Sequence, residues 1–267
     1  MEKSVSMFFH EPGISARTAF EQERKMMHLN RIKLESESFL RHDCYPFNLD
    51  IFKNGLELPF SRPVTFFAGE NGTGKSTLLE GIALRSGIKI WKGVNRRRFE
   101  HNPYEDRLYQ ALTVDWVNGP VPGSFFASQI FQHFARLLDE WAASDPGILE
   151  YFGGRSLLTQ SHGQSLMSFF RSRYQIRGIY LLDEPETALS PVSQIELLRL
   201  LVAASQAGHA QFIVATHSPI LLACPGAEIY SFDRKPVSVI AYEDSEYYNV
   251  YRDFLLDREK YLNPEKS

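Results

Sequence analysis

The sequence has few cysteines, no net positive charge and no long apolar run, and each absence excludes a class of protein. Only two of its 267 residues are cysteine, Cys44 and Cys224, and they lie far apart without the spacing of metal ligands. The net charge is −3, so no global basic field indicates nucleic acid or an anionic membrane as a partner. No apolar run approaches the roughly 20 residues that span a membrane, and the N-terminus lacks a signal-peptide hydrophobic region. We therefore expect a cytoplasmic protein that does not itself insert into a membrane.

Internal repeats, low-complexity linkers and long heptad runs are absent too, which excludes solenoids and long coiled coils. Residues 1–28 follow no clear period, so we interpret them as an N-terminal arm, with a helical part near 18–27. Residues 29–267 are ordinary in composition and predict a single domain with a buried core.

What the chain does contain is an alternation of short apolar runs with helical stretches. Continuous apolar runs favour parallel strands that are covered on both faces. Four such runs lie at residues 64–68, 179–182, 212–215 and 229–232. The class predicted is therefore α/β.

Two helices can be predicted near the C-terminal end of this pattern. Val192, Ile195, Leu198 and Leu201 recur at helical spacing, with Ser190-Pro191 before them and Gly208 after them as start and stop signals. Tyr248, Tyr251 and Phe254 show the same spacing, and we expect that last helix to pack on the sheet.

The strongest motif is GENGTGKST at residues 69–77, which has the spacing G-x-x-x-x-G-K-[ST] between an apolar strand and a helix. Glycines let successive N–H groups converge on phosphate oxygens, and the helix N-terminus faces the same oxygens. Lys75 would add a point charge for the β- and γ-phosphates, and the Ser76 hydroxyl could coordinate Mg²⁺. The predicted nucleotide-binding residues are Asn71, Gly72, Thr73, Gly74, Lys75, Ser76 and Thr77.

Two further strands end in residues suited to hydrolysis. Asp183 ends the apolar run of GIYLLDEP, where a buried carboxylate needs a partner such as Mg²⁺. Glu184 follows it, and the two-residue period of a strand would point it the other way, towards an attacking water. His217 follows the run FIVAT and could donate a hydrogen bond to the γ-phosphate. The predicted catalytic residues are thus Glu184, His217 and Lys75.

With these pieces in this order, the chain resembles the ABC-type ATPases over about residues 45–262. GENGTGKST, IYLLDEP and ATHSP carry the resemblance, and runs such as SHGQS and LLDEPETALSP are most similar to small stand-alone bacterial ATPases with an SMC-like head. The resemblance implies a P-loop NTPase (RecA-like) core with a largely parallel sheet. It also implies a helical lobe at about 128–175 that carries the ABC signature, and ATP with Mg²⁺ as the bound species.

The signature of the family corresponds to Ser161-His162-Gly163-Gln164, shortly before Asp183. The same residues also have the capping-box spacing S-x-x-Q of a helix start, and the two interpretations are compatible. The resemblance implies that Ser161, Gly163 and Gln164 meet the γ-phosphate bound by the opposite subunit. His162 stands where the family has glycine, which alters the contact geometry.

A fourth element of the family is a glutamine that touches Mg²⁺ and the attacking water. The resemblance assigns this role to Gln129 in GSFFASQ, with Gln110 in LYQAL as the competitor. The predicted metal ligands are then Ser76, Gln129 and Asp183.

The function expected from the resemblance is an ATPase that acts as an ATP-dependent head-to-tail homodimerisation switch and controls a protein partner or effector. One alternative is the energy-coupling subunit of a membrane transporter, but SLMSFFRSRYQIR replaces the helix that usually follows a transporter signature. A DNA-sensing or DNA-tethering ATPase is a second alternative, although the charge does not indicate nucleic acid. A small-molecule kinase that uses the phosphate loop alone is a third.

Overall fold

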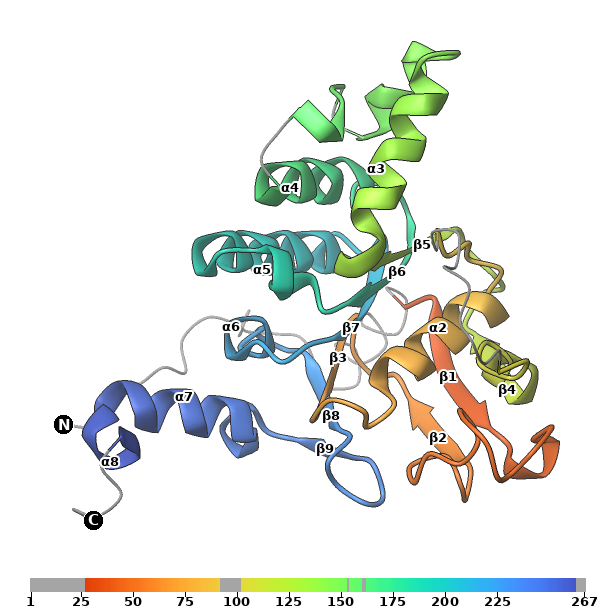
Figure 1. Cartoon of the computed structure of the whole chain (residues 1–267), viewed down its shortest axis with the longest axis vertical. Helices are drawn as coiled ribbons and strands as arrows, with labels where there is room; N and C mark the ends of the chain where they lie inside the picture. Colours follow the sequence, from red (N-terminus) through yellow and green to blue (C-terminus); the bar gives the residue numbers. More distant parts are fainter. Residues whose placement is uncertain (1–26, 92–101, 153, 160–161, 263–267) are drawn as a thin grey trace, which may run out of the picture.

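The computed structural model describes residues 27–91, 102–152, 154–159 and 162–262 (Figure 1). The expected N-terminal arm, apart from its last two residues, and Ser161 of the signature lie outside these ranges. Within them, no helix is long and apolar enough to cross a membrane.

A six-stranded sheet with the order β5-β6-β7-β3-β8-β9 forms the centre of the molecule. The first five strands in this order are parallel, and β9 is antiparallel to β8. The strands are β3 (Val64–Ala68), β5 (Gly123–Ala127), β6 (Gly178–Asp183), β7 (Ala210–Ala215), β8 (Glu228–Ser231) and β9 (Ser238–Ile240). All residues of β3 and β7 are buried, as continuous apolar runs require. The predicted α/β class with a largely parallel sheet is confirmed.

The register of this sheet brings the ends of four strands to one edge. Asp183 at the end of β6 pairs with Ala127 of β5 on one side and with Ala215 of β7 on the other. Ala215 in turn pairs with Phe67 of β3, one residue before that strand ends. The segments that follow these strands are therefore neighbours, although they are far apart in sequence.

A second, antiparallel sheet was not predicted from the sequence. It has the order β2-β1-β4 and consists of β1 (Leu29–Leu34), β2 (Leu56–Pro59) and β4 (Leu112–Trp116). The helix α2 (Lys75–Arg85) contacts β4 of this sheet and β6 and β7 of the central one. One buried apolar cluster, which includes Leu34, Leu79 and Ile213, joins the two sheets through α2.

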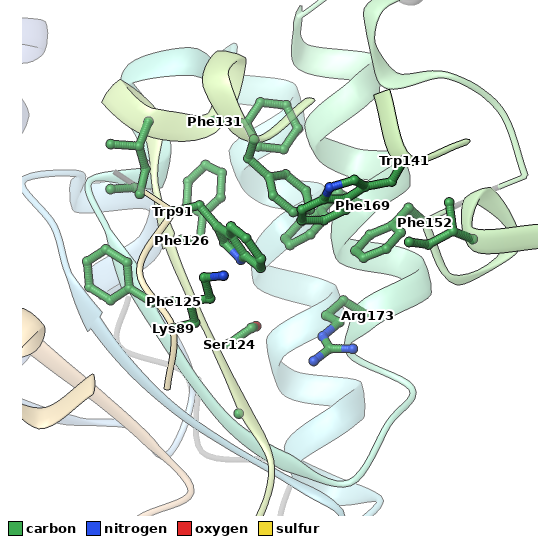
Figure 2. A pocket seen from close by; sticks show the side chains of 15 residues that line it. Lys89, Trp91, Ser124, Phe125, Phe126, Phe131, Trp141, Phe152, Phe169 and Arg173 are labelled. Carbon is green, nitrogen blue, oxygen red and sulfur yellow. The ribbon is translucent and has the colours of Figure 1, made fainter. Parts of the chain in front are cut away.

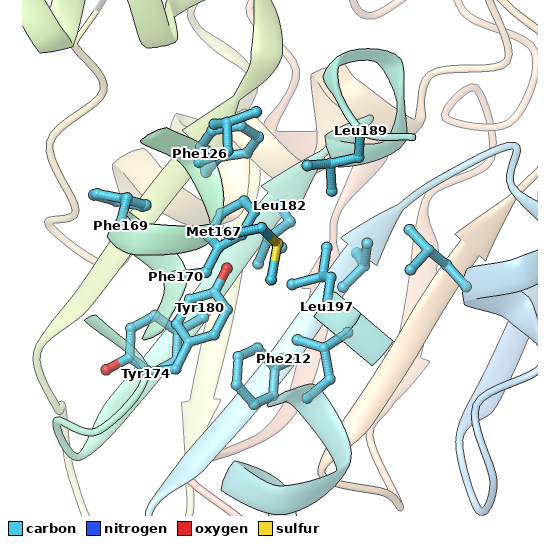
Figure 3. Packing of buried hydrophobic residues seen from close by; sticks show 14 of the residues in the cluster. Phe126, Met167, Phe169, Phe170, Tyr174, Tyr180, Leu182, Leu189, Leu197 and Phe212 are labelled. Carbon is cyan, nitrogen blue, oxygen red and sulfur yellow. The ribbon is translucent and has the colours of Figure 1, made fainter. Parts of the chain in front are cut away.

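The other face of the central sheet is covered by α3 (Ser128–Ala142), α4 (His162–Arg173) and α5 (Pro191–Gln206). Aromatic rings dominate this layer, and Figure 3 shows Phe170, Tyr174, Tyr180 and Phe212 lying against one another. Short helical turns connect the main elements: η1 (Ser36–Ser38), η2 (Leu108–Ala111), η3 (Pro146–Phe152), η4 (Leu157–Thr159), η5 (Pro185–Ala188) and η6 (Tyr242–Asp244).

Helix α5 has the predicted start and stop, but only part of the predicted apolar stripe is buried. The Ser190 hydroxyl accepts a hydrogen bond from the Ser193 N–H, and Gly208 past the end has a positive φ of 73°. The buried side chains are those of Leu197, Leu201, Ala204 and Ser205, and of these only Leu201 belongs to the predicted stripe. Val192 and Ile195 are exposed, because α5 is apolar on two sides and only one of them faces the sheet.

The prediction that the last helix packs on the central sheet is wrong. It divides into α7 (Glu246–Leu256) and α8 (Arg258–Leu262), and neither contains a buried residue. Helix α7 contacts η6, α8 and the short α6 (Pro219–Leu222), and it extends away from the sheet (Figure 1). Apolar residues at helical spacing predict a helix, but they do not say which element covers it.

Candidate active site

The phosphate loop connects β3 to α2 and contains three glycines with positive φ: Gly69, Gly72 and Gly74. Gly74 is the N-cap of α2, and a Cβ added there would lie 3.1 Å from Ile51 and 3.2 Å from Phe52. Because no side chain caps α2, the first N–H groups of the helix have no side-chain acceptor and remain directed at the loop. This arrangement suits an anion, since unpaired N–H groups and the helix dipole attract negative charge at the same point.

Lys75 is buried within this loop. Its ammonium group donates to the carbonyl oxygen of Glu70 at 2.7 Å and to that of Gly69. Burial lowers the pKa of Lys75, and the carboxylates of Glu184 and Asp233 act in the opposite direction. A cation is thus held where a bound phosphate would lie against the loop.

Ser76 and Asp183 meet as the metal prediction requires. The Ser76 hydroxyl donates to the Asp183 carboxylate at 2.8 Å, although the residues are 107 positions apart. Burial raises the pKa of Asp183 to about 7. A buried carboxylate beside a hydroxyl offers the hard oxygen ligands that Mg²⁺ prefers, and a cation there would offset the cost of burying the charge. These two residues therefore fit a magnesium site.

We call the edge of the central sheet where β3, β5, β6 and β7 end the catalytic edge. Glu184 lies there, but its position does not follow from the two-residue period of a strand. Strand β6 ends at Asp183, and Glu184 adopts a left-handed conformation with φ 45° and ψ 54°. Three contacts fix it there: its N–H donates to the Ala215 carbonyl, and its own carbonyl accepts from the Ser128 and Thr187 hydroxyls. A left-handed backbone conformation costs about 1–3 kcal/mol in a residue other than glycine. Strain of this kind is concentrated at functional sites. The turn, rather than strand alternation, directs this carboxylate.

His217 faces Glu184 from the end of β7. Its Nε2 lies 3.5 Å from a Glu184 carboxylate oxygen, and its Nδ1 lies 2.8 Å from the Tyr247 hydroxyl. The backbone N–H of His217 donates to Glu186 at 2.6 Å. Burial lowers the pKa of His217, and the Lys75 charge lowers it further, so the imidazole is neutral in this arrangement.

The two candidate glutamines lie next to different sheets. Gln129 is the second residue of α3, immediately beyond the end of β5 and two positions after Ala127, the register partner of Asp183. Gln110 lies in η2, which leads into β4 of the antiparallel sheet. The placement favours Gln129 as the residue at the catalytic edge, and no contact joins it to Asp183.

The signature region is only partly described. Helix α4 begins at His162, directly after Ser161, in agreement with the capping-box prediction of a helix start. A Cβ on Gly163 would lie 3.8 Å from the carbonyl oxygen of Ala188 in η5. The start of α4 is therefore beside the turn that follows Glu184 in the same chain, and Gln164 is exposed there.

Four residues at the site were missed by the sequence reasoning. Glu186 and Tyr247 hold His217, and Asp233 accepts the Glu70 N–H at 2.7 Å at the start of the phosphate loop. Tyr45 is the fourth of these residues. The Tyr45 side chain is 39% exposed, and its hydroxyl lies 2.8 Å from the Thr77 hydroxyl. An aromatic residue that precedes a phosphate loop was the only available signal.

A separate hollow of about 240 Å³ lies between β5, α3 and α4 (Figure 2). Aromatic rings surround it, including those of Trp91, Trp141, Phe152 and Phe169, and its cationic side chains are Lys89 and Arg173. None of its described lining residues is a carboxylate. It therefore lacks a general base, and the catalytic edge remains the candidate active site.

Comparison with known proteins agrees with this geometry. Residues 157–223 match a family described as "AAA domain, putative AbiEii toxin, Type IV TA system", and residues 47–93 match one described as "AAA domain". The chain is 30% identical over 186 residues to the thiamine import ATP-binding protein ThiQ of Vibrio vulnificus, and the match covers 65% of this chain and 77% of that protein.

Two solved structures are also similar. The SMC head domain from Thermotoga maritima has a TM-score of 0.43 and 18% identity, over 80% of this chain and 98% of that one. An ATP-binding cassette of an ABC transporter in its ADP conformation has a TM-score of 0.49 and 14% identity, over 85% of this chain and 99% of that one.

Proposed function

The chain belongs to the ABC-type ATPases, and from that premise we propose that it binds ATP with Mg²⁺, hydrolyses it, and uses the cycle to close and open a head-to-tail pair of copies. The observation that carries the proposal is the contact between the Ser76 hydroxyl and the partly buried Asp183 carboxylate. It brings the phosphate loop and the end of β6 to one point, where oxygen ligands for a cation lie next to an anion-binding loop.

In this proposal, each side chain at the catalytic edge has a separate role in phosphoryl transfer. The loop N–H groups and Lys75 bind the phosphates, and Ser76 and Asp183 would hold Mg²⁺, with Gln129 as the further ligand. Bound Mg²⁺ supplies positive charge for the phosphate oxygens. Glu184 orients a water and accepts its proton as the water oxygen bonds to the terminal phosphorus and the bond to the bridging oxygen breaks. His217 donates from Nε2 to the terminal phosphate, so catalysis is positioning together with electrostatic stabilisation.

The start of α4 supports the dimer part of the proposal. A helix N-terminus that begins within Ser161-His162-Gly163-Gln164 is suited to an anion, and Gly163 has no side chain to keep a phosphate away. We assign Ser161, Gly163 and Gln164 to the γ-phosphate bound by the other copy. The closed pair would then act on a protein partner that recognises only that state.

The decisive experiment uses Glu184→Gln, which keeps the size of the side chain but removes the base. We expect turnover to fall at least ~100-fold, as is typical for the loss of a general base. We also expect ATP with Mg²⁺ to convert this variant from monomer to dimer, as measured by light scattering. Lys75→Ala should lose ATP binding and stay monomeric.

Glu37→Gln is the matched control, because Glu37 is exposed on η1, outside the proposed site. It should behave as the unaltered protein. A Glu184→Gln form that binds ATP and remains monomeric would refute the dimer switch, and a Lys75→Ala form that binds ATP normally would refute the phosphate-loop assignment.

The second candidate function is the energy-coupling subunit of a membrane transporter. The match to the thiamine import ATP-binding protein favours it, because the name of that relative places it in an import system. Purification of Glu184→Gln with ATP from cells separates the two candidates. An ATP-dependent integral membrane partner would support the transporter subunit, whereas a partner without membrane spans would support the switch.

A further inference from the structure

Tyr247 joins the C-terminal helix to the catalytic edge. It is the second residue of α7, and its hydroxyl lies 2.8 Å from His217 Nδ1. The two rings also meet edge to face, with centroids 5.2 Å apart and an interplanar angle of 82°. Two independent contacts, one polar and one aromatic, therefore fix the His217 ring against a helix whose residues are otherwise mostly exposed.

The direction of the hydrogen bond follows from what each nitrogen of His217 faces. Nε2 faces the Glu184 carboxylate at 3.5 Å, and an ionised carboxylate can only accept. The proton of the neutral ring is therefore on Nε2, and Nδ1 has a lone pair. Tyr247 then donates its O–H to Nδ1. The hydroxyl keeps its proton because burial raises the pKa of Tyr247 above the usual value.

The resulting tautomer is the one that the proposed reaction needs. His217 Nε2 is buried and has no hydrogen-bond partner among the described residues, so it has a donor left for a group that enters the site. The opposite tautomer would carry the proton on Nδ1 and present a lone pair to the Glu184 carboxylate and to any phosphate oxygen, and both contacts would be repulsive.

We propose that Tyr247 is a positioning residue that holds His217 as the Nε2–H tautomer, so that α7 becomes part of the hydrolysis machinery. This inference rests on the proposed function, in which His217 donates to the terminal phosphate. An open groove of about 780 Å³ lies against α5, α6 and α7 and includes His217 and Glu186 in its lining. A displacement of α7 would move Tyr247 and thereby alter the donor at the catalytic edge.

The test compares Tyr247→Phe with Tyr248→Phe. Both changes remove one hydroxyl from the same helix, but the Tyr248 ring packs on Tyr242 and Arg252, and the contacts to His217 come from Tyr247. For Tyr247→Phe we expect kcat to fall roughly fivefold to tenfold, the value of one hydrogen bond, while KM for ATP stays within about twofold. Tyr248→Phe should leave both constants unchanged.

A second readout does not depend on turnover. Nitrogen-15 NMR of ring-labelled histidine distinguishes the two tautomers, and a His217→Asn sample identifies the signals of His217 among the eight histidines of the chain. We expect the unaltered protein and Tyr248→Phe to show the Nε2–H form, and Tyr247→Phe to show a mixture of the two.

The outcomes separate this inference from the proposed function. An unchanged His217 tautomer in Tyr247→Phe overturns the inference, as does an equal fall in kcat in both tyrosine variants. If the unaltered protein hydrolyses no ATP, the proposed function fails, and the NMR comparison alone decides whether Tyr247 sets the tautomer.

Discussion

The catalytic edge and the groove between α5 and α7 differ in what their side chains contact. At the edge, which comprises Lys75, Ser76, Asp183, Glu184 and His217, each polar side chain lies within 3.5 Å of another polar group. In the groove, whose lining includes Ile195, Tyr251 and Leu255, large apolar side chains are exposed. Strands β3 and β7 below the edge are buried throughout, whereas α7 contains no buried residue.

The difference shows that the two regions contribute differently to stability and to recognition. The edge buries charged groups above a packed core. This burial lowers the stability of the folded chain, but it fixes the positions of the side chains at the site. The groove exposes apolar surface, which adds little to the fold of one chain and is characteristic of surfaces that meet other molecules. The predictions below test whether the regions separate in this way.

The largest effect is expected in the core beneath the edge. Phe212 is fully buried in β7, and its ring contacts those of Tyr174 and Tyr180. Phe212→Ala removes most of these contacts and leaves a cavity, so we expect a loss of about 3–5 kcal/mol in the free energy of unfolding. Chemical denaturation measures it. A loss below about 1 kcal/mol would mean that this aromatic layer does not hold the sheet together.

Asp183 is expected to lower the stability of the nucleotide-free protein. Its pKa of about 7 means that the fold keeps a proton that the unfolded chain has already released, so stability falls as the pH rises from its unfolded pKa towards about 7. Asp183→Asn keeps an acceptor for Ser76 and removes this cost. We expect a gain of about 2–4 kcal/mol at about pH 8, at roughly 1.4 kcal/mol per pKa unit. The gain should fall to about 1 kcal/mol or less at about pH 4.5, and it is lost only below the unfolded pKa.

Thermal unfolding of both proteins at the two pH values measures this difference. Equal gains at both pH values would assign the effect to packing instead of charge. Saturating Mg²⁺ and nucleotide should reduce the gain at the higher pH, because a ligand that binds only the folded state stabilises the unaltered protein more than the variant that has lost a metal ligand.

Local and contiguous features of the edge could be predicted from the sequence, and long-range ones could not. The phosphate loop is specified by nine consecutive residues, and Asp183 and His217 follow apolar runs that are visible without a structure. The contact of Asp233 with Glu70 joins residues 163 positions apart, and that of Tyr247 with His217 joins residues 30 apart. Side-chain periodicity contains no information about such pairs.

Two errors have the same physical origin, because a periodic pattern reports a local conformation only. Strand alternation was extended to Glu184, but the chain leaves β6 one residue earlier and turns into the left-handed region. Helical spacing correctly predicted α5 and a helix at 246–256, but the covered face depends on where the neighbouring elements lie. For α5 the side with Leu197 and Leu201 is buried, whereas Val192 and Ile195 of the predicted stripe stay exposed.

The smallest effect is expected on that stripe, and it allows a comparison within one helix. Val192 is 77% exposed and Leu197 is fully buried, although both lie on α5. Leu197→Ala should cost about 2–5 kcal/mol, whereas Val192→Ala should change the free energy of unfolding by no more than about 0.5 kcal/mol, because it removes few contacts and alanine favours a helix. Unfolding at low and high protein concentration checks both. If Val192→Ala becomes costly only at high concentration, a second copy of the chain covers the exposed side of α5 at Val192, and this surface is not free.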